Sequence, residues 1–203
     1  MDPQHLSELQ IDALGEVGSI GAGHAATALS QLLGASVDID VPDIRLLPVS
    51  EVPSVFGGPE NLVGAVYSRL LGDISGALLF ILPRQDLLAL ADLLRSREPG
   101  SAKSLGVAEE GLVVHAAGVL QSAYLAAIAR LTELAILPGP PQFAFDMLGG
   151  ILEFVTAEIG MKADTALLIV SRFLSTEIVV DGALFYLPDP DSLDVLLGRL
   201  GIV

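Results

Sequence analysis

Residues 12–42 read DALGEVGSIGAGHAATALSQLLGASVDIDVP, and this stretch decides both the expected fold and the candidate site. Most of it is apolar or very small, and Glu16 is its first acid after Asp12. Residues three or four apart share a face of a helix. One face would therefore carry small or polar groups throughout: Asp12, Glu16, Ser19, Gly23, Thr27 and Ser30. The opposite stripe suits a core: Leu14, Val17, Gly21, Ala25, Leu29 and Leu32.

This helix face allows two interpretations. An acid surrounded by small residues lets another surface approach closely, which indicates a docking face with Glu16 and Ser19 at the contact. The alternative is a solvated helix face whose few polar groups have no role. The face alone does not choose between them, and the rest of the chain must decide.

The composition excludes several kinds of protein. The chain has 203 residues, a formal net charge of −15 and no cysteine. Such acidity disfavours nucleic acid and anionic membrane as partners and tolerates a basic one, although acidity for solubility alone explains it as well. Without cysteine there are no disulfides, thiolate metal sites or Cys nucleophiles. The three histidines (His5, His24 and His115) have no metal-ligand spacing, so we expect no metal site.

Two stretches without formal charge approach the length of a membrane span, Val17–Val37 and Gly111–Ala129. Both contain polar residues, and we interpret them as largely buried central helices, not as membrane spans. The N-terminal residues show no signal peptide. We therefore expect a cytoplasmic protein without membrane insertion.

The second half of the chain repeats motifs of the first. SRLL at 68–71 and GALLFILP at 76–83 recur in the same order as SRFL at 171–174 and GALFYLP at 182–188. Repeated short matches in one order indicate an internal duplication. The predicted fold class is α/β, a pseudo-two-fold duplicated domain with two long helices packed on a shared, mostly antiparallel sheet. Residues 1–203 would form one domain of two homologous halves, about 1–100 and 101–203.

Each half has the same expected plan. A long helix (6–33 or 106–132) precedes an extended segment (37–49 or 134–146). Two strands follow (62–71 with 74–82, and 165–174 with 177–187), with turn residues near the strand ends at Gly72-Asp73 and Asp181-Gly182. A closing helix starts after Pro83 or Pro188. Residues 96–104 are expected to link the halves, 52–61 to form a loop, and 147–160 to form an extra short helix.

The opening helix closely resembles the first helix of the CheC family of chemotaxis phosphatases, which includes CheX, FliY and the middle domain of FliM. The family pattern is Asp or Ser, three residues, Glu, two residues, Asn, then twenty-two residues and Pro. Asp12, Glu16, Ser19 and Pro42 stand at those positions with that spacing. The resemblance extends through the small-residue run at 21–30 to a PPQFAFDM block at 140–147.

The resemblance implies a function. Members of this family dock a long helix into the active site of the phosphorylated response regulator CheY. The Asn orients a water for attack on the aspartyl phosphate, and the Glu pairs with the active-site Lys of CheY. Glu16 and Ser19 would then be the catalytic pair, with Asp12 and Gly23 contacting the partner. No cofactor is expected, because the Mg²⁺ belongs to CheY.

The sequence departs from the family pattern at the catalytic positions. Ser19 stands where the amide is expected, and a hydroxyl lacks the planar donor and acceptor pair of an amide. In the second half His115 replaces the Glu and Gly118 replaces the Asn, with Pro141 at the family spacing. We predict that this second site is degenerate, although Gln121 offers an amide nearby.

Three functions follow from these observations. The chain is a phosphatase using only its first site, or a catalytically degenerate relative that binds phosphorylated CheY or the receptor deamidase CheD. The third function is that of a rotor scaffold like the FliM middle domain. We expect this third function less, because the sequence shows neither an N-terminal CheY-binding peptide extension nor a C-terminal extension. The identity of the partner, the oligomeric state and any role of His24 cannot be derived from the sequence.

Overall fold

The computed structural model describes residues 7–40, 43–158, 165–175, 179–189 and 191–201. The elements follow in the order α1 (Glu8–Leu33), β1 (Val37–Ile39), β2 (Asp43–Pro48), the 3-10 helix η1 (Val49–Glu51), α2 (Val52–Val55), β3 (Leu62–Gly72), β4 (Gly76–Pro83), α3 (Arg84–Leu94), α4 (Val107–Thr132), β5 (Ile136–Pro138), β6 (Gln142–Met147), α5 (Leu148–Glu158), β7 (Thr165–Ser175), β8 (Val179–Pro188) and α6 (Ser192–Arg199). The two long helices and the four long strands lie where the sequence predicts them.

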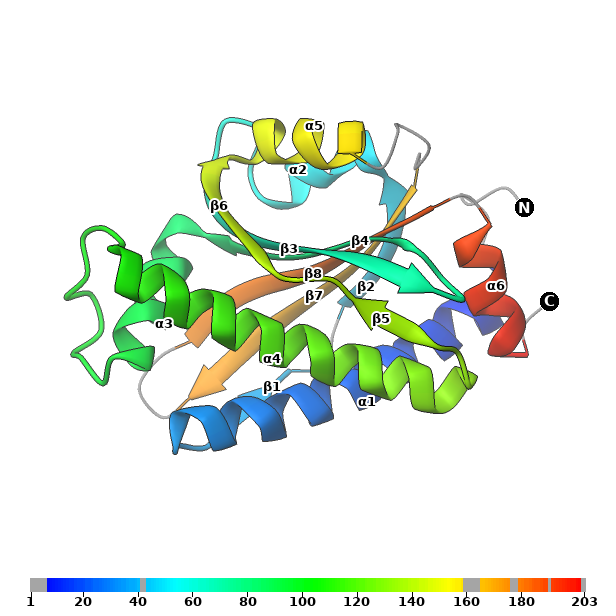
Figure 1. Ribbon diagram of the computed structural model, residues 1–203, viewed down its shortest axis with the longest axis horizontal. Helices are drawn as coiled ribbons and strands as arrows, with labels where there is room; N and C mark the ends of the chain where they lie inside the picture. The colour runs from blue at the N-terminus through cyan, green and yellow to red at the C-terminus, as the bar shows by residue number, and fades with distance from the viewer. Residues whose placement is uncertain (1–6, 41–42, 159–164, 176–178, 190, 202–203) are drawn as a thin grey trace.

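One curled sheet organises the molecule, with strand order β1-β7-β8-β4-β3-β5 (Figure 1). Strand β2 also pairs with β7, and β6 also pairs with β3. Every pairing among the described strands is antiparallel. The predicted α/β class with a shared antiparallel sheet is therefore confirmed.

The two halves of the sequence exchange strands. The first half lends β1 and β2 to β7, and the second half lends β5 and β6 to β3, while β4 and β8 meet in the middle. Across the two halves the Arg69 guanidinium donates to the Asp189 carboxylate, with Nη2 and Oδ2 2.6 Å apart. We propose that 1–203 folds as one domain, because neither half completes its sheet alone. The duplication itself stays a prediction from the sequence.

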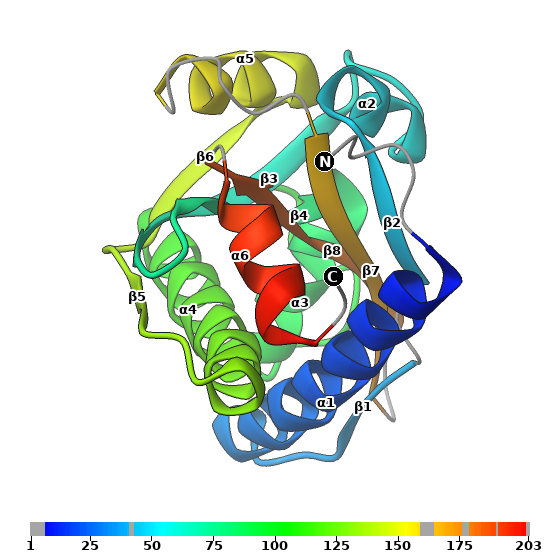
Figure 2. The same ribbon diagram turned by 90° about the vertical axis from the view of Figure 1, so that its right-hand side faces the viewer.

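Helices α1 and α4 lie side by side across one face of the sheet, while α2 and α5 lie over the other face (Figures 1 and 2). Helix α1 begins with a capping box, in which the Ser7 hydroxyl accepts from the Gln10 N–H and the Gln10 side chain accepts from the Ser7 N–H. It ends at Gly34, whose φ of 64° is the left-handed conformation that glycine adopts without strain. These local signals fix both ends of the helix that carries the candidate site.

The sheet separates two apolar cores because its central strands are buried on both faces. Along β4, Leu78, Phe80 and Leu82 belong to the core under α1, α3 and α4, and the residues between them belong to the other core. Successive side chains of a strand point to opposite faces, so an unbroken apolar run such as GALLFILP serves both cores.

Two predictions for loops are wrong. The segment 52–61, predicted as a loop, contains the short helix α2. The extra short helix predicted at 147–160 is confirmed as α5, which lies with α2 on the face of the sheet opposite α1 and α4. Asp181 and Gly182 lie inside β8, not at a turn. Gly182 instead leaves room for aromatic rings: a Cβ there would be 3.0 Å from both Phe80 and Phe173, whose rings meet edge to face.

Candidate functional site

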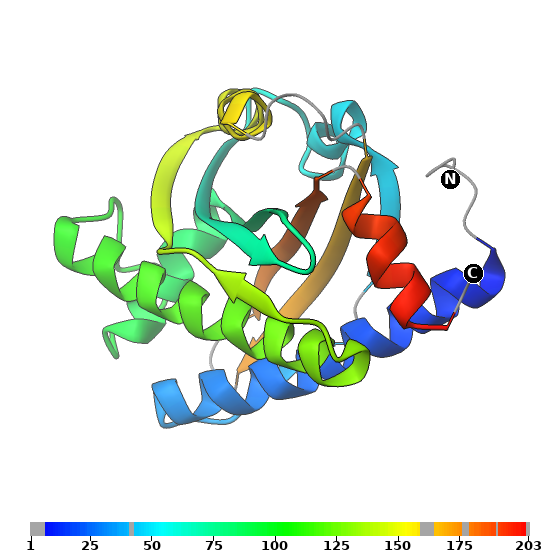
Figure 3. The ribbon, with the colours of Figure 1, turned by 45° about the vertical axis from the view of Figure 1, so that its right-hand side comes forward.

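Helix α1 presents the predicted polar face to solvent. Asp12, Glu16, Ser19 and Gly23 are all exposed. The opposite stripe is buried in the main core, with Leu14 3 % and Ala25 0 % exposed. The periodicity of residues 12–30 thus predicted correctly which side of the helix faces outward. Helix α1 lies beside α4 along the outside of the molecule (Figure 3). We call Asp12, Glu16, Ser19 and Gly23 the α1 face.

Within the α1 face, Ser19 is held by its own helix. The Ser19 hydroxyl donates to the Gly15 carbonyl at 2.9 Å. Thr27 does the same to Gly23 at 3.0 Å. Bonding of this kind leaves the hydroxyl oxygen with acceptor capacity only, since its one proton is already used. Ser19 therefore offers an outward acceptor and no outward donor.

Glu16 lies one turn before Ser19 on the same face. Within the described part of the chain it makes no hydrogen bond or ion pair, and α1 contains no Lys or Arg. An exposed carboxylate without an internal partner is available to a cation on another molecule. Glu16 and Ser19 together thus offer an anionic anchor and a neutral acceptor one helical turn apart.

A shallow groove continues the α1 face towards β1. It is lined by residues of the second half of α1 and of the connection to β1: Gly23, Ala26, Thr27, Ser30, Gln31 and Gly34–Ile39. The Ser30 hydroxyl accepts from the Val37 N–H at 2.9 Å, which ties the strand back to the helix. Many of its lining residues are Gly, Ala or Ser, so the groove offers a concave contact surface beside Glu16 and Ser19.

Helix α4 carries the corresponding second face. His115 is exposed and Gly118 is partly exposed, and both line a groove with Gly111, Ser122, Pro141 and Ala28 of α1. Among the described residues, a Cβ on Gly118 would have only Pro141 within 4 Å, at 3.8 Å. Pro141, which stands at the family spacing from Gly118 in the sequence, thus also lies beside it in space. Pro42, its counterpart in the first half, lies outside the described residues.

The suggestion that Gln121 offers an amide to this second face is wrong. Gln121 is 2 % exposed. Its amide donates to the Val66 carbonyl at 2.9 Å and accepts from the Ser68 hydroxyl at 2.8 Å. The side chain is thus used to fasten α4 to β3, as buried polar groups require. The second face, which we call the α4 face, has His115 and Gly118 where the first has Glu16 and Ser19.

The described residues contain no metal-ion cluster, and one of their helices has the length and hydropathy of a membrane span. No group of three or more His, Asp or Glu side chains within them is placed to hold a metal ion. Helix α4 is long and apolar enough to cross a membrane, by length and composition only. Its apolar side packs against α1, α3 and the sheet, as the core helix of a folded domain does.

These features define a class of protein: an α/β domain that exposes an acid and a hydroxyl on a long helix with small neighbours. The profile of the CheC-like family matches residues 9–45, which contain the whole α1 face. The chain is also 32% identical over 200 residues to the CheY-P phosphatase CheC of Bacillus subtilis (strain 168), covering 97% of this chain and 96% of that protein. The chain belongs to the CheC family, which confirms the resemblance seen in the opening helix.

Two further relatives agree with this assignment. The flagellar motor switch phosphatase FliY of the same organism is 30% identical over 138 residues, which are 68% of this chain but only 36% of FliY. The chain thus matches about a third of that protein's length. The crystal structure of FliY from Thermotoga maritima superposes with a TM-score of 0.80, covering 97% of this chain and 98% of that one. At 18% identity this likeness shows the fold alone.

Proposed function

We propose that this chain dephosphorylates a CheY-like response regulator by docking the α1 face into the regulator's active site. The observation that carries the proposal is the exposed pair of Glu16 and Ser19, in a chain 32% identical to a CheY-P phosphatase. The proposed site of action is the cytoplasm, where such a regulator would be met. Asp12 and Gly23 would contact the regulator on either side of the pair.

In this proposal Glu16 anchors the complex. Its carboxylate would pair with the lysine of the regulator's active site, forming a charge-assisted hydrogen bond in a closed interface. The small residues around it allow the helix backbone to approach the phosphoryl group closely. The metal ion that neutralises the phosphoryl oxygens would belong to the regulator, so this chain needs no cofactor.

Ser19 would position the attacking water. Because its proton is held by the Gly15 carbonyl, its oxygen accepts a hydrogen bond from the water and turns a water lone pair towards phosphorus. The water oxygen then forms a bond to phosphorus while the bond to the aspartyl oxygen breaks, which leaves inorganic phosphate and a free carboxylate. This is catalysis by positioning, and one acceptor positions a water less firmly than a planar amide.

Single-turnover decay of the phosphorylated regulator, with and without saturating protein, tests the proposal. Faster decay is expected, and Glu16→Ala and Ser19→Ala should each remove the acceleration. A loss with His115→Ala in their place would assign the activity to the α4 face. No acceleration by the unmodified protein would rule out the phosphatase.

A second function rests on the same face. Since Ser19 replaces the amide of the family pattern, a chain that binds without hydrolysis is the alternative, with phosphorylated CheY or the deamidase CheD as its ligand. Titration with each protein separates the two functions: saturable binding without faster decay supports the binding module.

A further inference from the structure

The contact between α1 and α4 contains one unusually close approach. A Cβ placed on Gly21 would lie 2.4 Å from Cδ1 and 2.8 Å from Cε1 of Tyr124. Real Cβ atoms essentially never lie closer than 3.0 Å to such neighbours, and ordinary contact begins at 3.4 Å. A side chain at position 21 would therefore require a movement of at least about 0.6 Å, and of about 1 Å to reach ordinary contact. The ring of Tyr124 thus lies directly on the backbone of α1.

Tyr124 has little freedom to move away. It is 1 % exposed and belongs to the main core between the helices and the sheet. A ring packed at the density of a protein interior yields only if its neighbours also shift. Helix α1 therefore rests on a fixed support, and any added atom at Gly21 would push the helix outward.

This support lies behind the α1 face. With about 100° between successive residues of an α-helix, Ser19 stands about 200° and Glu16 about 140° around the axis from Gly21. Both are therefore nearly opposite the contact. A push at Gly21 moves Glu16 and Ser19 straight out from the protein, along the direction in which the regulator would approach.

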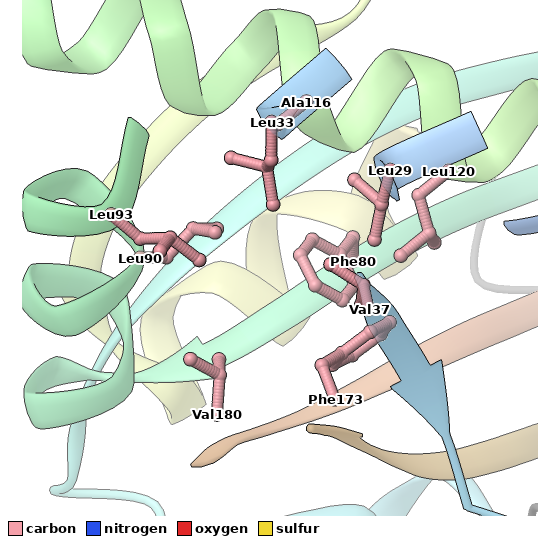
Figure 4. Close-up of a pocket in the computed structure, with 10 residues that line it drawn as sticks. All are labelled: Leu29, Leu33, Val37, Phe80, Leu90, Leu93, Ala116, Leu120, Phe173 and Val180. Carbon is pink, nitrogen blue, oxygen red and sulfur yellow. The ribbon is translucent and has the colours of Figure 1, made fainter. Parts of the chain in front are cut away.

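Further along α1 the packing is looser. Leu29 and Leu33 cover an entirely apolar cavity of about 30 Å³, together with Val37, Phe80, Leu120 and Phe173 (Figure 4). A dry space under this end of the helix gives less support than the ring does under Gly21. The contact with Tyr124, and not the packing around this cavity, therefore determines how far the α1 face projects from the protein.

We propose that Tyr124 is a positioning residue: its ring, supplied by the second half of the chain, sets how far Glu16 and Ser19 project. The inference rests on the proposed function. In this way α4 contributes to the reaction through the buried Tyr124. The exposed His115 and Gly118 of the α4 face need not take part. Binding depends on the exposed side chains, whereas the position of the attacking water is sensitive to shifts of about 1 Å, which cost on the order of 10²-fold.

The test compares Gly21→Ala with Gly111→Ala in single-turnover decay of the phosphorylated regulator. Both changes add one methyl group to a glycine in a long helix, but a Cβ on Gly111 meets no described residue within 4 Å. We expect Gly21→Ala to lower the maximal rate about 10²-fold, with an unchanged half-saturating concentration and a cooperative thermal melt at a lower temperature, since overpacking a core reduces stability. Gly111→Ala should match the unmodified protein.

Changes at Tyr124 complete the test. Tyr124→Phe keeps the ring atoms that touch Gly21, so the rate should be kept. Tyr124→Leu makes space, and the double variant Gly21→Ala/Tyr124→Leu should recover at least about tenfold of the loss, because the two sites are in contact. If Gly21→Ala unfolds the protein, the pair of Tyr124→Phe and Tyr124→Leu decides, with a lowered maximal rate expected only for the latter.

Two outcomes would overturn the inference. An active, folded Gly21→Ala variant with the rate of Gly111→Ala leaves the proposed function standing and removes the role of Tyr124. Equal rates for Tyr124→Phe and Tyr124→Leu do the same. Failure of the unmodified protein to accelerate decay would remove both the function and the inference.

Discussion

The α1 face and the α4 face have the same form but different chemistry. Each belongs to a long helix on the same side of the sheet, and each lies beside a shallow groove. The first exposes Glu16 and Ser19, and the second has His115 and Gly118 at the corresponding positions. In the proposed function, the small residues of either helix would provide the shape for docking, while two side chains would decide whether a reaction can follow.

The largest effect is expected from removing the anchoring side chain of the α1 face, with removal of its counterpart on the α4 face as the control. Glu16→Ala should slow dephosphorylation by about 10²-fold or more, since the regulator's lysine loses its anionic partner and the water its alignment. His115→Ala, the matched control, should leave the rate unchanged. Rates measured for both variants at saturating protein decide the matter, and an equal loss in both would mean that the two faces work together.

The next effect concerns the hydroxyl of the α1 face. Ser19→Asn should raise the rate about tenfold, because an amide offers the water both a donor and an acceptor in one plane. The increase should appear in the maximal rate and not in the affinity. A Ser19→Asn variant no faster than the unmodified protein would show that the serine already suffices or that another group orients the water.

A smaller effect is expected from building the missing pair on the α4 face. The double variant His115→Glu/Gly118→Asn has room for the new amide, since Pro141 is the one described residue within 4 Å of a Cβ at position 118, at 3.8 Å. Two sites of similar activity would at most about double the rate per chain. The measurement is best made in a Glu16→Ala background, where any recovered activity belongs to the second face. No recovered dephosphorylation in that background would mean that the groove of the α4 face does not accept the regulator.

The smallest effect lies at the starts of the two helices. Helix α1 begins with a side-chain capping box, whereas α4 begins at Gly106 without one and has Glu109 in its first turn. The pKa of Glu109 is lowered, first by the hydrogen bond from its own backbone N–H and then by Arg95 and Arg97. A lowered carboxyl pKa contributes stability above its ordinary value of 4.5, and that contribution is lost as the pH falls through the folded value.

Glu109→Gln should therefore reduce stability slightly at pH 7 and flatten its decline below about pH 4.5. Urea unfolding at several pH values measures both, with Glu110→Gln on the same turn as the control. A decline that stays as steep in Glu109→Gln as in the unmodified protein would assign the acid sensitivity to other carboxylates.

The sequence predicted this fold well because its signals are local and periodic. The face of α1, the alternation of Val37 and Ile39, and the unbroken apolar run of β4 each specify an element and its buried side. The wrong predictions concern residue types that occur in more than one structural setting. Gly182 resembles a turn glycine but gives space to two aromatic rings, and Gln121 resembles a site amide but bonds to β3.

The candidate site was predictable only in part. Glu16 and Ser19 could be found because helical spacing places them together on an exposed face. The contact of Gly21 with Tyr124 could not, since the two residues are distant in sequence and meet only when α1 packs on α4. No local pattern records which ring supports a glycine, so the height of the face follows from the packing alone.

In the proposed function the α1 face, and not the α4 face, receives the phosphorylated regulator. The chain has no cysteine, so Thr27→Cys on α1 and Ala126→Cys on α4 each give one attachment point for an environment-sensitive fluorophore. Both positions are exposed, and they correspond when Glu16 is aligned with His115. Titration with the regulator activated with beryllofluoride should change the fluorescence of the label at position 27 until it saturates. The fluorescence of the label at position 126 should stay unchanged. A saturating change at position 126 alone, or equal changes at both, would contradict the account.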